Sequence, residues 1–403
     1  MAKKHGTIVL FLILFGTMLI IGYVENIKGV SLPLIKTEFG ISYEQQGIMV
    51  SLISLCFVVF CFVGGIIVGS FGAKRSLIAG FTALTAGIVL IAIPPLLKLP
   101  GFLSLGALFI ITASFGLLEL SINALAARAF TVKAALLMNL LHFFYGAGSS
   151  ISPRIAGSIA SHTNWRNIYL LALPIVLILF IPSVFQRFSL EKKSGAPGEE
   201  TKGPGFFTAA KNPMALFFSL VLGLMVAVEM SSINWAGLYF QDVYNLDPKS
   251  SGAVFISNFF IFFTISRLVS GFAIEKIGYM RSLIICSAAT FFIFLLGFIL
   301  GEKGIYVLPF SGFFIALFWP TLLAVALGYF REDAPVMLSV IIVSSGAINS
   351  LMQFLIGLVN RIIGPAWGYR SSLIYLVIII AALFVLAKNL RRPYKAGYGN
   401  TAG

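Results

Sequence analysis

Charged residues are scarce in this sequence: Asp, Glu, Lys and Arg together make up 10% of its 403 residues. A soluble protein of this length carries about 25% charged residues to cover its surface. Hydrophobic residues, in contrast, make up 59% of the chain. The shortage of charge therefore excludes an ordinary soluble protein and predicts that most of the surface contacts lipid.

Cysteine and histidine are also scarce, with three residues of each. Cys56, Cys61 and Cys286 lie inside apolar runs, so we interpret them as small packing residues and not as disulfide partners or metal ligands. The histidines lie too far apart for a metal site, and the chain has no Gly-x-x-x-x-Gly-Lys-Ser/Thr loop to bind ATP. No catalytic constellation appears either. We therefore expect neither an enzyme nor a bound metal or organic cofactor.

Long apolar runs fill most of the chain. A membrane-spanning helix needs about 20 largely apolar residues, and the bilayer interior requires backbone that satisfies its own hydrogen bonds. The first run lacks a small-residue cleavage site, so we expect a membrane helix there and not a signal peptide. The sequence predicts an all-α membrane protein with twelve transmembrane helices, at 7–35, 44–70, 75–96, 103–129, 134–160, 165–186, 212–239, 250–274, 281–300, 304–329, 334–361 and 369–388.

The formal net charge is +14, from 28 Lys and Arg against 14 Asp and Glu. In a soluble protein such an excess can indicate nucleic-acid binding. In a membrane protein, basic residues gather in the cytoplasmic loops. With the N-terminus inside, most Lys and Arg residues of this chain fall on the cytoplasmic side. We therefore expect no nucleic-acid partner, and a multi-pass protein of the bacterial inner (plasma) membrane with both termini cytoplasmic.

The most polar stretch lies between the sixth and seventh spans. It is rich in charge and contains several Gly and Pro residues, a composition typical of a flexible linker. The sequence therefore predicts an N-terminal six-helix bundle at 1–186, a cytoplasmic linker at 187–211, and a C-terminal six-helix bundle with a short cytoplasmic tail at 212–403. No oligomer-forming element is evident, so we expect a monomer in the lipid bilayer.

A pattern of acidic, glycine and arginine residues repeats between the two halves. Glu25, Gly47, Gly65, Gly72 and Arg75 match Glu229, Gly252, Gly271, Gly278 and Arg281. Parallel six-helix halves related in this way occur in transporters, where the substrate site lies near the bilayer midplane between the halves.

These repeated loops resemble a motif of the major facilitator superfamily, Gly-x-x-x-Asp-Arg-x-Gly-Arg-Lys/Arg-Arg. The copy from Gly271 to Arg281 has Glu275 and Lys276 at the acid and base positions. The first copy, at 65–75, lacks the acid and the first base. The resemblance covers the whole chain and implies a major facilitator fold of two pseudo-symmetric six-helix bundles.

A narrower resemblance is to the fucose:proton symporters, which include glucose/mannose:proton symporters. It rests on Gly116-Leu-Leu-Glu119-Leu-Ser-Ile-Asn123, on Val228-Glu229-Met-Ser-Ser-Ile-Asn234-Trp235, on Phe318-Trp319-Pro320-Thr321, and on the Gly-rich helix that contains Asn139, His142, Tyr145 and Pro153. The resemblance implies that Glu119 takes part in proton coupling. The family's helix-1 acid corresponds to a position near Gly29, and here Glu25 lies one turn earlier.

Three acids lie at membrane depth: Glu25, Glu119 and Glu229. A charge at the bilayer centre costs at least about 2.5–3.5 kcal/mol, so these side chains are not expected to face lipid. The resemblance places them on cavity-lining helices. Glu119 and His142 both lie about 13 Å from the cytoplasmic edge at the rise of an α-helix, so contact between them is plausible. The four residues are candidates for proton coupling, and a static hydrogen bond between helices is the alternative for Glu119 and His142.

The remaining polar and aromatic residues of the cavity-lining helices are candidates for substrate binding. Glu25 and Lys28 are three residues apart and can pair on one helix face. Asn can bond to hydroxyl groups, and a Trp ring offers an apolar wall to a sugar. The alternatives are packing for the Trp residues and a headgroup contact for the arginine. The candidates are Lys28, Asn123, Asn139, Tyr145, Asn234, Trp235, Trp319 and Arg154.

Charged residues near the cytoplasmic ends of the helices form a candidate gate. Arg267 precedes Glu275 by about two helical turns, and Arg331 follows helix 10. Arg75 and Arg281 lie in the repeated loops. We expect ion pairs here that close the cytoplasmic side, and ordinary surface charge is the alternative.

The sequence therefore predicts a secondary transporter that works by alternating access, with a proton as the coupling ion and a small polar solute such as a monosaccharide as substrate. One alternative is a proton-coupled antiporter that exports drugs or metabolites, since 146–157 also resembles the superfamily's antiporter motif. Another is a receptor or lipid-handling protein on the same fold.

Overall fold

The computed structural model describes residues 2–130, 134–186 and 205–390, apart from the side chains of 2–7, 134–136, 270–273, 332 and 335. Most of the predicted linker and the C-terminal tail lie outside the described residues, as does the side chain of Glu332 beside the candidate gate. Every regular element in the described ranges is helical.

Helices of the first half account for the first six predicted spans. Eleven helices among the described residues are long and apolar enough to cross a bilayer, and α6 is a further helix of similar length. The elements of this half are α1 (Ala2–Asn26), α2 (Lys28–Phe39), α3 (Tyr43–Phe71), α4 (Ala73–Leu96), α5 (Leu103–Ala129), α6 (Ala134–His162), α7 (Trp165–Leu170) and α8 (Leu173–Phe185).

The second half supplies the other six spans, so the predicted all-α fold with twelve transmembrane helices is confirmed. Its elements are α9 (Phe206–Ala209), α10 (Pro213–Asn234), α11 (Ala236–Tyr244), η1 (Pro248–Gly252), α12 (Ala253–Ile277), α13 (Tyr279–Ile299), η2 (Gly301–Lys303), α14 (Gly304–Val307), η3 (Leu308–Phe310), α15 (Ser311–Ile315), α16 (Phe318–Phe330), η4 (Arg331–Asp333), α17 (Ala334–Ile362), α18 (Trp367–Arg370) and α19 (Ser372–Asn389). The tenth span was predicted as one helix, and it is divided near Pro309 because proline cannot donate a backbone hydrogen bond.

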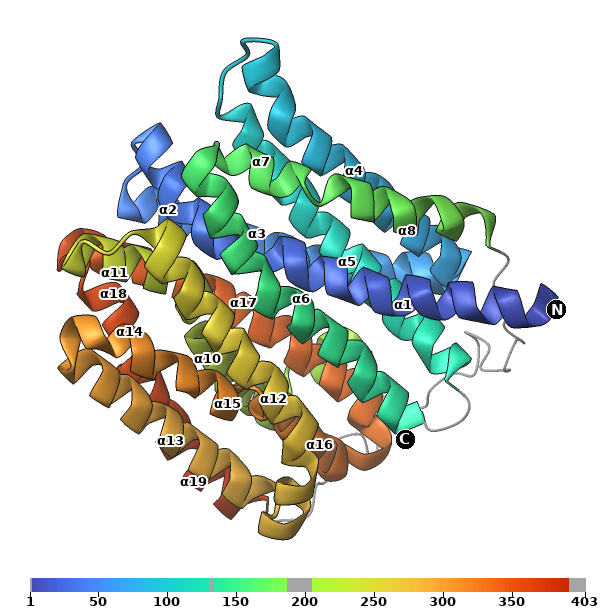
Figure 1. Cartoon of the computed structure of the whole chain (residues 1–403). Helices are drawn as coiled ribbons and strands as arrows, with labels where there is room; N and C mark the ends of the chain where they lie inside the picture. The colour runs from blue at the N-terminus through green and yellow to red at the C-terminus, as the bar shows by residue number, and fades with distance from the viewer. Residues whose placement is uncertain (1, 131–133, 187–204, 391–403) are drawn as a thin grey trace.

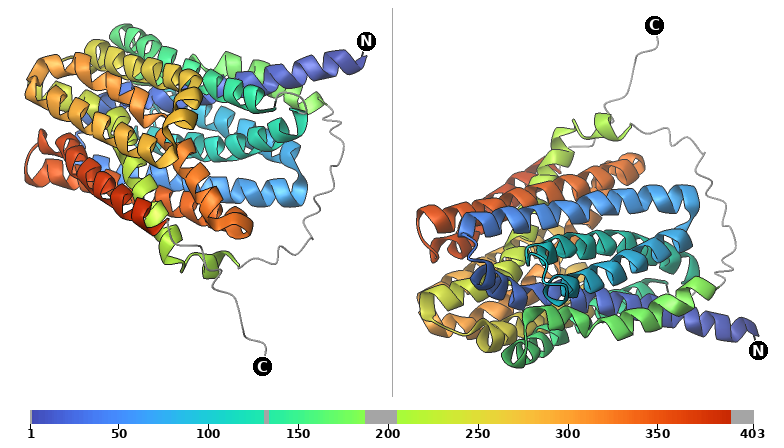
Figure 2. Two further views of the ribbon diagram at one scale, coloured as in Figure 1. Left: turned by 90° about the horizontal axis from the view of Figure 1, so that it is seen from below. Right: turned by 90° about the horizontal axis from the view of Figure 1, so that it is seen from above.

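The long helices run roughly along one direction (Figures 1 and 2). We call the end where α1 begins and α8 ends the terminal end, and the end where α2 and α11 lie the distal end. In Figure 1 the terminal end is on the right and the distal end is on the left.

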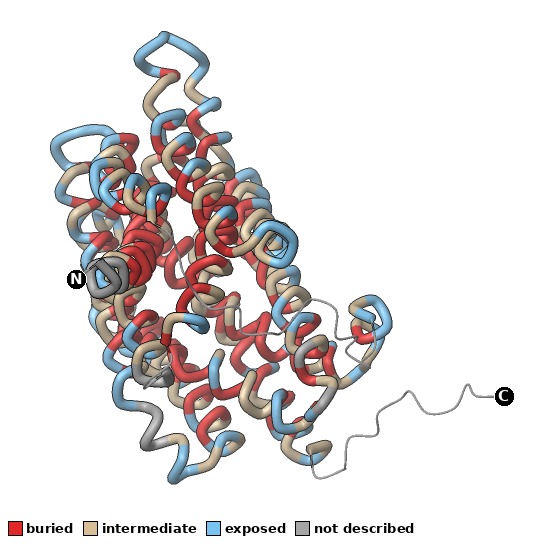
Figure 3. The backbone as a smooth tube through the Cα atoms, turned by 90° about the vertical axis from the view of Figure 1, so that its right-hand side faces the viewer, coloured by how far each residue is buried: buried red, intermediate tan, exposed pale blue. Residues whose placement is uncertain are grey.

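Buried hydrophobic residues form two cores. One draws on residues between Leu10 and Leu179 together with Ala253, and the other on residues between Ala209 and Leu386. Viewed along the bundle in Figure 3, the buried stretches face inward and the exposed ones outward. Across the two cores, α3 packs on α17 and α6 packs on α12. The domain boundaries at 186 and 211 stay predictions.

Glycine allows the close approach of α3 and α17. A Cβ atom on Gly47 would lie 3.0 Å from the Cα atom of Gly357 and 3.1 Å from the carbonyl oxygen of Phe354. Small residues at helix crossings let backbones come together in this way, which strengthens van der Waals packing inside a membrane. The two halves are therefore in backbone contact near the distal end.

The repeated loops share one backbone conformation. Gly72 joins α3 to α4 with φ of 86°, and Gly278 joins α12 to α13 with φ of 89°. Only glycine adopts this region without strain, which explains why glycine stands at the matching position in both halves. The sequence repeat thus corresponds to a repeat of local structure.

Two matching helices are interrupted about two-thirds of the way along their length. The first breaks at Ile27, between α1 and α2, and the second at Trp235, between α10 and α11. Pro33 adds to the first interruption because it cannot donate to the carbonyl of Gly29, one turn earlier. Broken helices of matching halves often line the binding site of a transporter. Here they carry several of the candidate residues.

Candidate functional site

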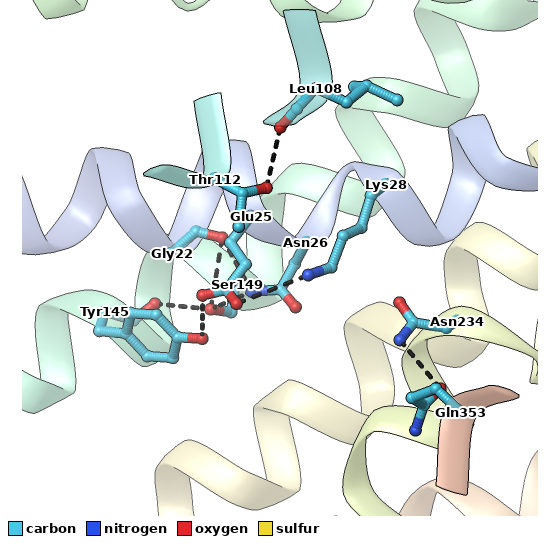
Figure 4. A network of polar contacts seen from close by, with 10 residues as sticks. All are labelled: Gly22, Glu25, Asn26, Lys28, Leu108, Thr112, Tyr145, Ser149, Asn234 and Gln353. Atoms are coloured by element: carbon cyan, nitrogen blue, oxygen red, sulfur yellow. Dashed lines mark hydrogen bonds and ion pairs between the residues drawn. The ribbon is translucent and has the colours of Figure 1, made fainter. Parts of the chain in front are cut away.

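The carboxylate of Glu25 is held at the break in the first helix. The phenol of Tyr145 on α6 donates a 2.9 Å hydrogen bond to Oε2 of Glu25 (Figure 4). Lys28 Nζ lies 3.6 Å from Oε1 of the same carboxylate, as their three-residue spacing predicts. All three side chains are partly exposed. The carboxylate is therefore paired and still accessible to a ligand.

A second contact fixes α1 against α6 beside this carboxylate. Asn26 donates from Nδ2 to the hydroxyl of Ser149 at 2.9 Å and to the carbonyl oxygen of Gly22 at 3.0 Å. Asn26 and Ser149 are both buried. A fully buried polar contact of this kind aligns two helices, so it sets the position of Glu25 relative to Tyr145.

A pocket lies beside Glu25 and Lys28 at the helix break. Asn234 is the only residue of the second half in its lining, and its wall is otherwise built by α1, α2, α3, α5 and α7. The lining residues are Val24, Glu25, Lys28, Ser31, Leu32, Val50, Ile53, Ser54, Leu108, Ile111, Thr112, Phe115, Tyr169 and Asn234.

Sequence reasoning missed the small hydroxyl residues of this pocket. Ser31 contacts the Tyr169 hydroxyl at 3.0 Å, and Thr112 donates to the carbonyl of Leu108 at 2.9 Å. Serine and threonine are common in membrane helices and often bond to their own backbone. Residue type alone therefore did not indicate that Ser31 and Thr112 belong to a binding site. Their position in the pocket lining makes them candidates.

Two further candidate acids lie close to one arginine. The Arg267 guanidinium on α12 attracts the carboxyl groups of Glu119 on α5 and Glu229 on α10 electrostatically. Glu25 also repels both of these carboxyl groups. Arg267 lies over the ring of Phe263 at 4.6 Å, and its Nε is buried without a hydrogen-bond partner among the described residues. Acids from both halves thus share one cation.

This position of Arg267 differs from the expected one beside Glu275. The ion pairs of the described residues do not include Arg267 with Glu275, which is exposed. Arg267 instead faces inward from α12. Two helical turns separate the residues along the axis, and their directions around the helix send one side chain inward and the other outward.

The expected contact between Glu119 and His142 is not among the hydrogen bonds or ion pairs of the described side chains. His142 is half-buried on α6 and is influenced by the charge of Arg267. Equal depth along neighbouring helices fixes the height of two side chains and leaves their directions open. This explains why the depth argument brought the residues to one level without bringing them into contact.

Asn234 and Trp235, at the break in the second helix, are almost completely buried, with 3% and 1% of their surfaces exposed. Both donate to Oε1 of Gln353 on α17, Asn234 from Nδ2 at 3.3 Å and Trp235 from Nε1 at 2.9 Å. Trp235 belongs to the second hydrophobic core. Of this pair, Asn234 reaches the pocket, whereas the indole of Trp235 packs behind it.

The other candidate binding residues are more scattered. Asn123 is half-buried, and its Oδ1 lacks a partner in the described part of the chain. Trp319 packs against the second core, and Asn139 is exposed on α6. Arg154 is exposed and donates a 2.9 Å hydrogen bond to Asn258 Oδ1, which joins α6 to α12.

The candidate gate residues lie at the terminal end. Arg75, Arg281, Arg331 and Glu275 are all exposed. The ion pairs between described residues include none of these four. In this conformation these four candidate gate residues therefore form no ion pair that joins the halves at the terminal end.

At the distal end, polar contacts do join the halves. Tyr43 donates a 2.5 Å hydrogen bond to Asp242, which also lies 3.9 Å from Lys36. Arg361 pairs with Glu44. Nothing in the sequence distinguishes these residues from other loop residues. Their contacts between the two halves identify them as candidates for a gate. We call these four contacting segments, around Lys36, Tyr43–Glu44, Asp242 and Arg361, the distal seam.

Comparison with protein families places the chain among membrane transporters. The model of the Major Facilitator Superfamily matches residues 13–341. The chain is 24% identical over 356 residues to the putative glucose/galactose transporter of Helicobacter pylori, covering 82% of this chain and 84% of that protein. It is 28% identical over 188 residues to bypass of stop codon protein 6 of Saccharomyces cerevisiae, and this match covers 40% of the chain and only 36% of the yeast protein.

Solved structures agree on the fold. The Escherichia coli fucose:proton symporter FucP superposes with a TM-score of 0.65 at 17% identity, covering 96% of this chain and 100% of that one. A second FucP structure, described as being in the outward conformation, also gives a TM-score of 0.65. At a sequence identity this low, the similarity to these structures shows a shared fold and no more.

Proposed function

Because the chain belongs to the major facilitator superfamily and is therefore a multi-pass membrane transporter and not an enzyme, we propose that it moves a monosaccharide together with a proton. The observation that carries this proposal is the pocket at the two helix breaks. There Glu25, Lys28 and Asn234 stand beside one another, with a donor and two acceptors available to a solute.

The pocket encloses about 20 Å³ in this conformation, so it must widen as the halves move before it holds a sugar. Its chemistry suits a neutral polyhydroxyl solute. Sugar hydroxyls both donate and accept hydrogen bonds, so they match the ammonium of Lys28, the carboxylate of Glu25 and the amide of Asn234. The apolar side chains of Val50, Ile111 and their neighbours can cover the less polar face of a sugar ring. The glucose/galactose transporter named among the relatives supports this substrate class.

The charge balance of the site supports a proton as the coupling ion. Among the described residues, Glu25, Glu119 and Glu229 interact with two permanent cations, Lys28 and Arg267. One added proton brings this group to neutrality, which reduces the cost of keeping it at membrane depth. Glu119 carries that proton, and the other two acids or His142 assist its passage.

The distal seam supports a proposal for the direction in which the site opens. With the terminal end cytoplasmic, as the Lys and Arg distribution favours, the seam lies outside and closes the site to the exterior. Rocking of the halves would break the seam and bring the candidate gate residues together at the other end. The transporter works as a monomer in the bacterial inner membrane, with no cofactor other than the proton.

One observation favours a second function. Half of the residues that line the pocket are apolar, among them Leu32, Ile53, Leu108 and Phe115. Such a lining also suits an amphipathic drug or metabolite, which a proton-coupled antiporter would export. The two functions differ in the direction of solute movement relative to the proton.

Uptake into proteoliposomes tests the proposal. Labelled glucose, galactose, mannose and fucose are offered with an inward proton gradient, and an ionophore that dissipates the gradient serves as the control. We expect accumulation of at least one hexose that the ionophore abolishes. If no hexose moves under any gradient, the substrate assignment is wrong and export of an apolar solute becomes the better account.

A further inference from the structure

We propose that Gln353 of α17 is a positioning residue that turns the amide of Asn234 so that its carbonyl oxygen faces the pocket. This inference rests on the proposed function, since it names how the same site recognises a hydroxyl group. Gln353 lies outside the pocket lining and is fully buried. Its side chain can therefore act on a solute only through a neighbour.

The orientation begins at Trp235. An indole N–H can only donate a hydrogen bond. Nε1 of Trp235 lies 2.9 Å from Oε1 of Gln353, in an environment where both side chains are buried. The reverse orientation of Gln353 would place its NH2 group against the indole N–H, with two donors facing each other. Trp235 therefore fixes which end of the Gln353 amide is the acceptor.

The other end of the Gln353 amide agrees with this assignment. Its Nε2 donates to the Asn349 side-chain oxygen at 3.2 Å and to the carbonyl oxygen of Ala227 at 3.4 Å. Both of these partners accept. Donors and acceptors on Gln353 are thus satisfied together in only one orientation, and a buried amide left unpaired would cost free energy.

Gln353 in turn orients the side-chain amide of Asn234. Its Nδ2 donates to the same Oε1 of Gln353 at 3.3 Å (Figure 4). Its Oδ1 is buried and has no hydrogen-bond partner among the described residues, while the residue lines the pocket. A buried acceptor without a partner is costly, so it is suited to a ligand that donates.

The consequence is a selectivity rule. The pocket presents an acceptor at Asn234, so the solute must offer an O–H donor there. A deoxy analogue, which lacks the hydroxyl, and a fluoro analogue, whose fluorine cannot donate, should both bind roughly tenfold more weakly than the parent sugar at that one position. At a position read by a donor such as Lys28, fluorine can accept, and the fluoro analogue should retain more affinity than the deoxy analogue.

The experiment measures binding of a transported hexose and its singly deoxygenated and singly fluorinated analogues to purified full-length protein. The wild type is compared with Gln353→Met, which removes the acceptor, and Trp235→Phe, which removes the donor that orients it. In Gln353→Met the Asn234 amide is free to turn its NH2 group to the pocket. In Trp235→Phe the contacts of Gln353 with Ala227 and Asn349 still hold the acceptor oxygen of Gln353 toward Asn234. Gln353→Glu, measured at a pH at which this buried carboxyl is protonated, keeps an acceptor oxygen toward Trp235 and Asn234 and an O–H donor toward Ala227 and Asn349, and it serves as the matched control.

We expect one sugar position at which the wild type rejects the fluoro and deoxy analogues alike. In Gln353→Met, the fluoro analogue should regain affinity by severalfold relative to the deoxy analogue. Trp235→Phe and Gln353→Glu, which both keep the acceptor oxygen toward Asn234, should resemble the wild type. The inference is wrong if Gln353→Met keeps the wild-type ratio, or if it weakens every sugar by the same factor.

A measurement without substrate separates this inference from the proposed function. The indole N–H band of Trp235 in a vibrational spectrum reports its hydrogen bond, identified by its loss in Trp235→Phe. It should shift in Gln353→Met and stay in Gln353→Glu. An unchanged band in Gln353→Met overturns the inference. Failure of the wild type to bind any hexose, with the band shifted as expected, overturns only the substrate assignment.

Discussion

The hydroxyl groups of Ser51 and Ser350 lie 2.9 Å apart, although 299 positions separate the two residues in the sequence. Ser350 also donates a 2.7 Å hydrogen bond to the backbone carbonyl oxygen of Ser51. The pair joins α3 of the first half to α17 of the second, on the side of the molecule where Gly47 and Gly357 meet. It therefore marks the place where the halves must part if the distal end opens.

Replacing this pair by cysteines should lock the transporter. A disulfide requires Cβ atoms about 3.5–4.5 Å apart, a separation that suits side chains already in contact. Oxidation of the Ser51→Cys, Ser350→Cys double variant should stop uptake, and a reductant should restore it. Each single variant is the control. Full transport by the cross-linked protein would mean that α3 and α17 do not separate during the cycle.

Breaking the distal seam should expose the same region. The variant Asp242→Asn weakens contacts to Lys36 and Tyr43, and Arg361→Gln removes the pair with Glu44. Partly exposed ion pairs contribute about 0.2–1 kcal/mol each, so each change should raise labelling of a cysteine at position 350 by up to about fivefold. A membrane-impermeant thiol reagent provides the measurement. Lys98→Gln, in a loop of the same end, is the control, and equal labelling of all variants would contradict the gating role of the seam.

Removing the phenol that holds Glu25 should weaken solute binding. Tyr145→Phe deletes the 2.9 Å hydrogen bond and keeps the ring. Because a hydrogen bond to a charged group contributes about 1.5–3 kcal/mol, a partial loss of Glu25 orientation should raise KM for the transported sugar by about threefold to tenfold. The measurement is initial uptake, with the exposed Tyr306→Phe as control. An unchanged KM would show that Glu25 does not depend on this contact.

A cluster of polar side chains at the distal end is expected to stabilise the folded protein. Arg166 donates to both oxygens of Glu38, at 2.7 and 3.1 Å, and Trp165 donates to the same carboxylate at 2.6 Å. Glu38 is 39% exposed, so water relieves part of the cost when the arginine is lost. Arg166→Met should reduce the free energy of unfolding by about 1–3 kcal/mol. The melting temperature measures this, and the added change Glu38→Gln should recover part of it. An unaltered melting temperature in the single variant would contradict the expectation.

The architecture could be predicted from the sequence because lipid imposes simple rules. Apolar length located the spans, and matching residues in the two halves, Gly72 and Gly278 among them, indicated the repeat. The structure shows that these two glycines share a backbone conformation that other residues avoid. The three-residue spacing of Glu25 and Lys28 predicted their ion pair. Each of these inferences depended on local geometry.

The contacts between distant helices could not be predicted in the same way. Depth along a helix is readable from the sequence, whereas the direction of a side chain depends on packing. Arg267 was therefore assigned to the gate although it faces Glu119 and Glu229, and His142 was paired with Glu119 without contact. Gln353 gave no signal, because a single amide in a membrane helix usually serves only to join helices.

The most direct test of the account is the behaviour of Glu119→Gln in proteoliposomes under two conditions. The variant cannot bind and release the coupling proton at this position, while its side chain keeps nearly the same shape. The account predicts that it loses accumulation of hexose driven by an inward proton gradient and still exchanges labelled for unlabelled hexose across the membrane. Accumulation equal to that of the wild type would contradict the assignment of Glu119 as the proton carrier.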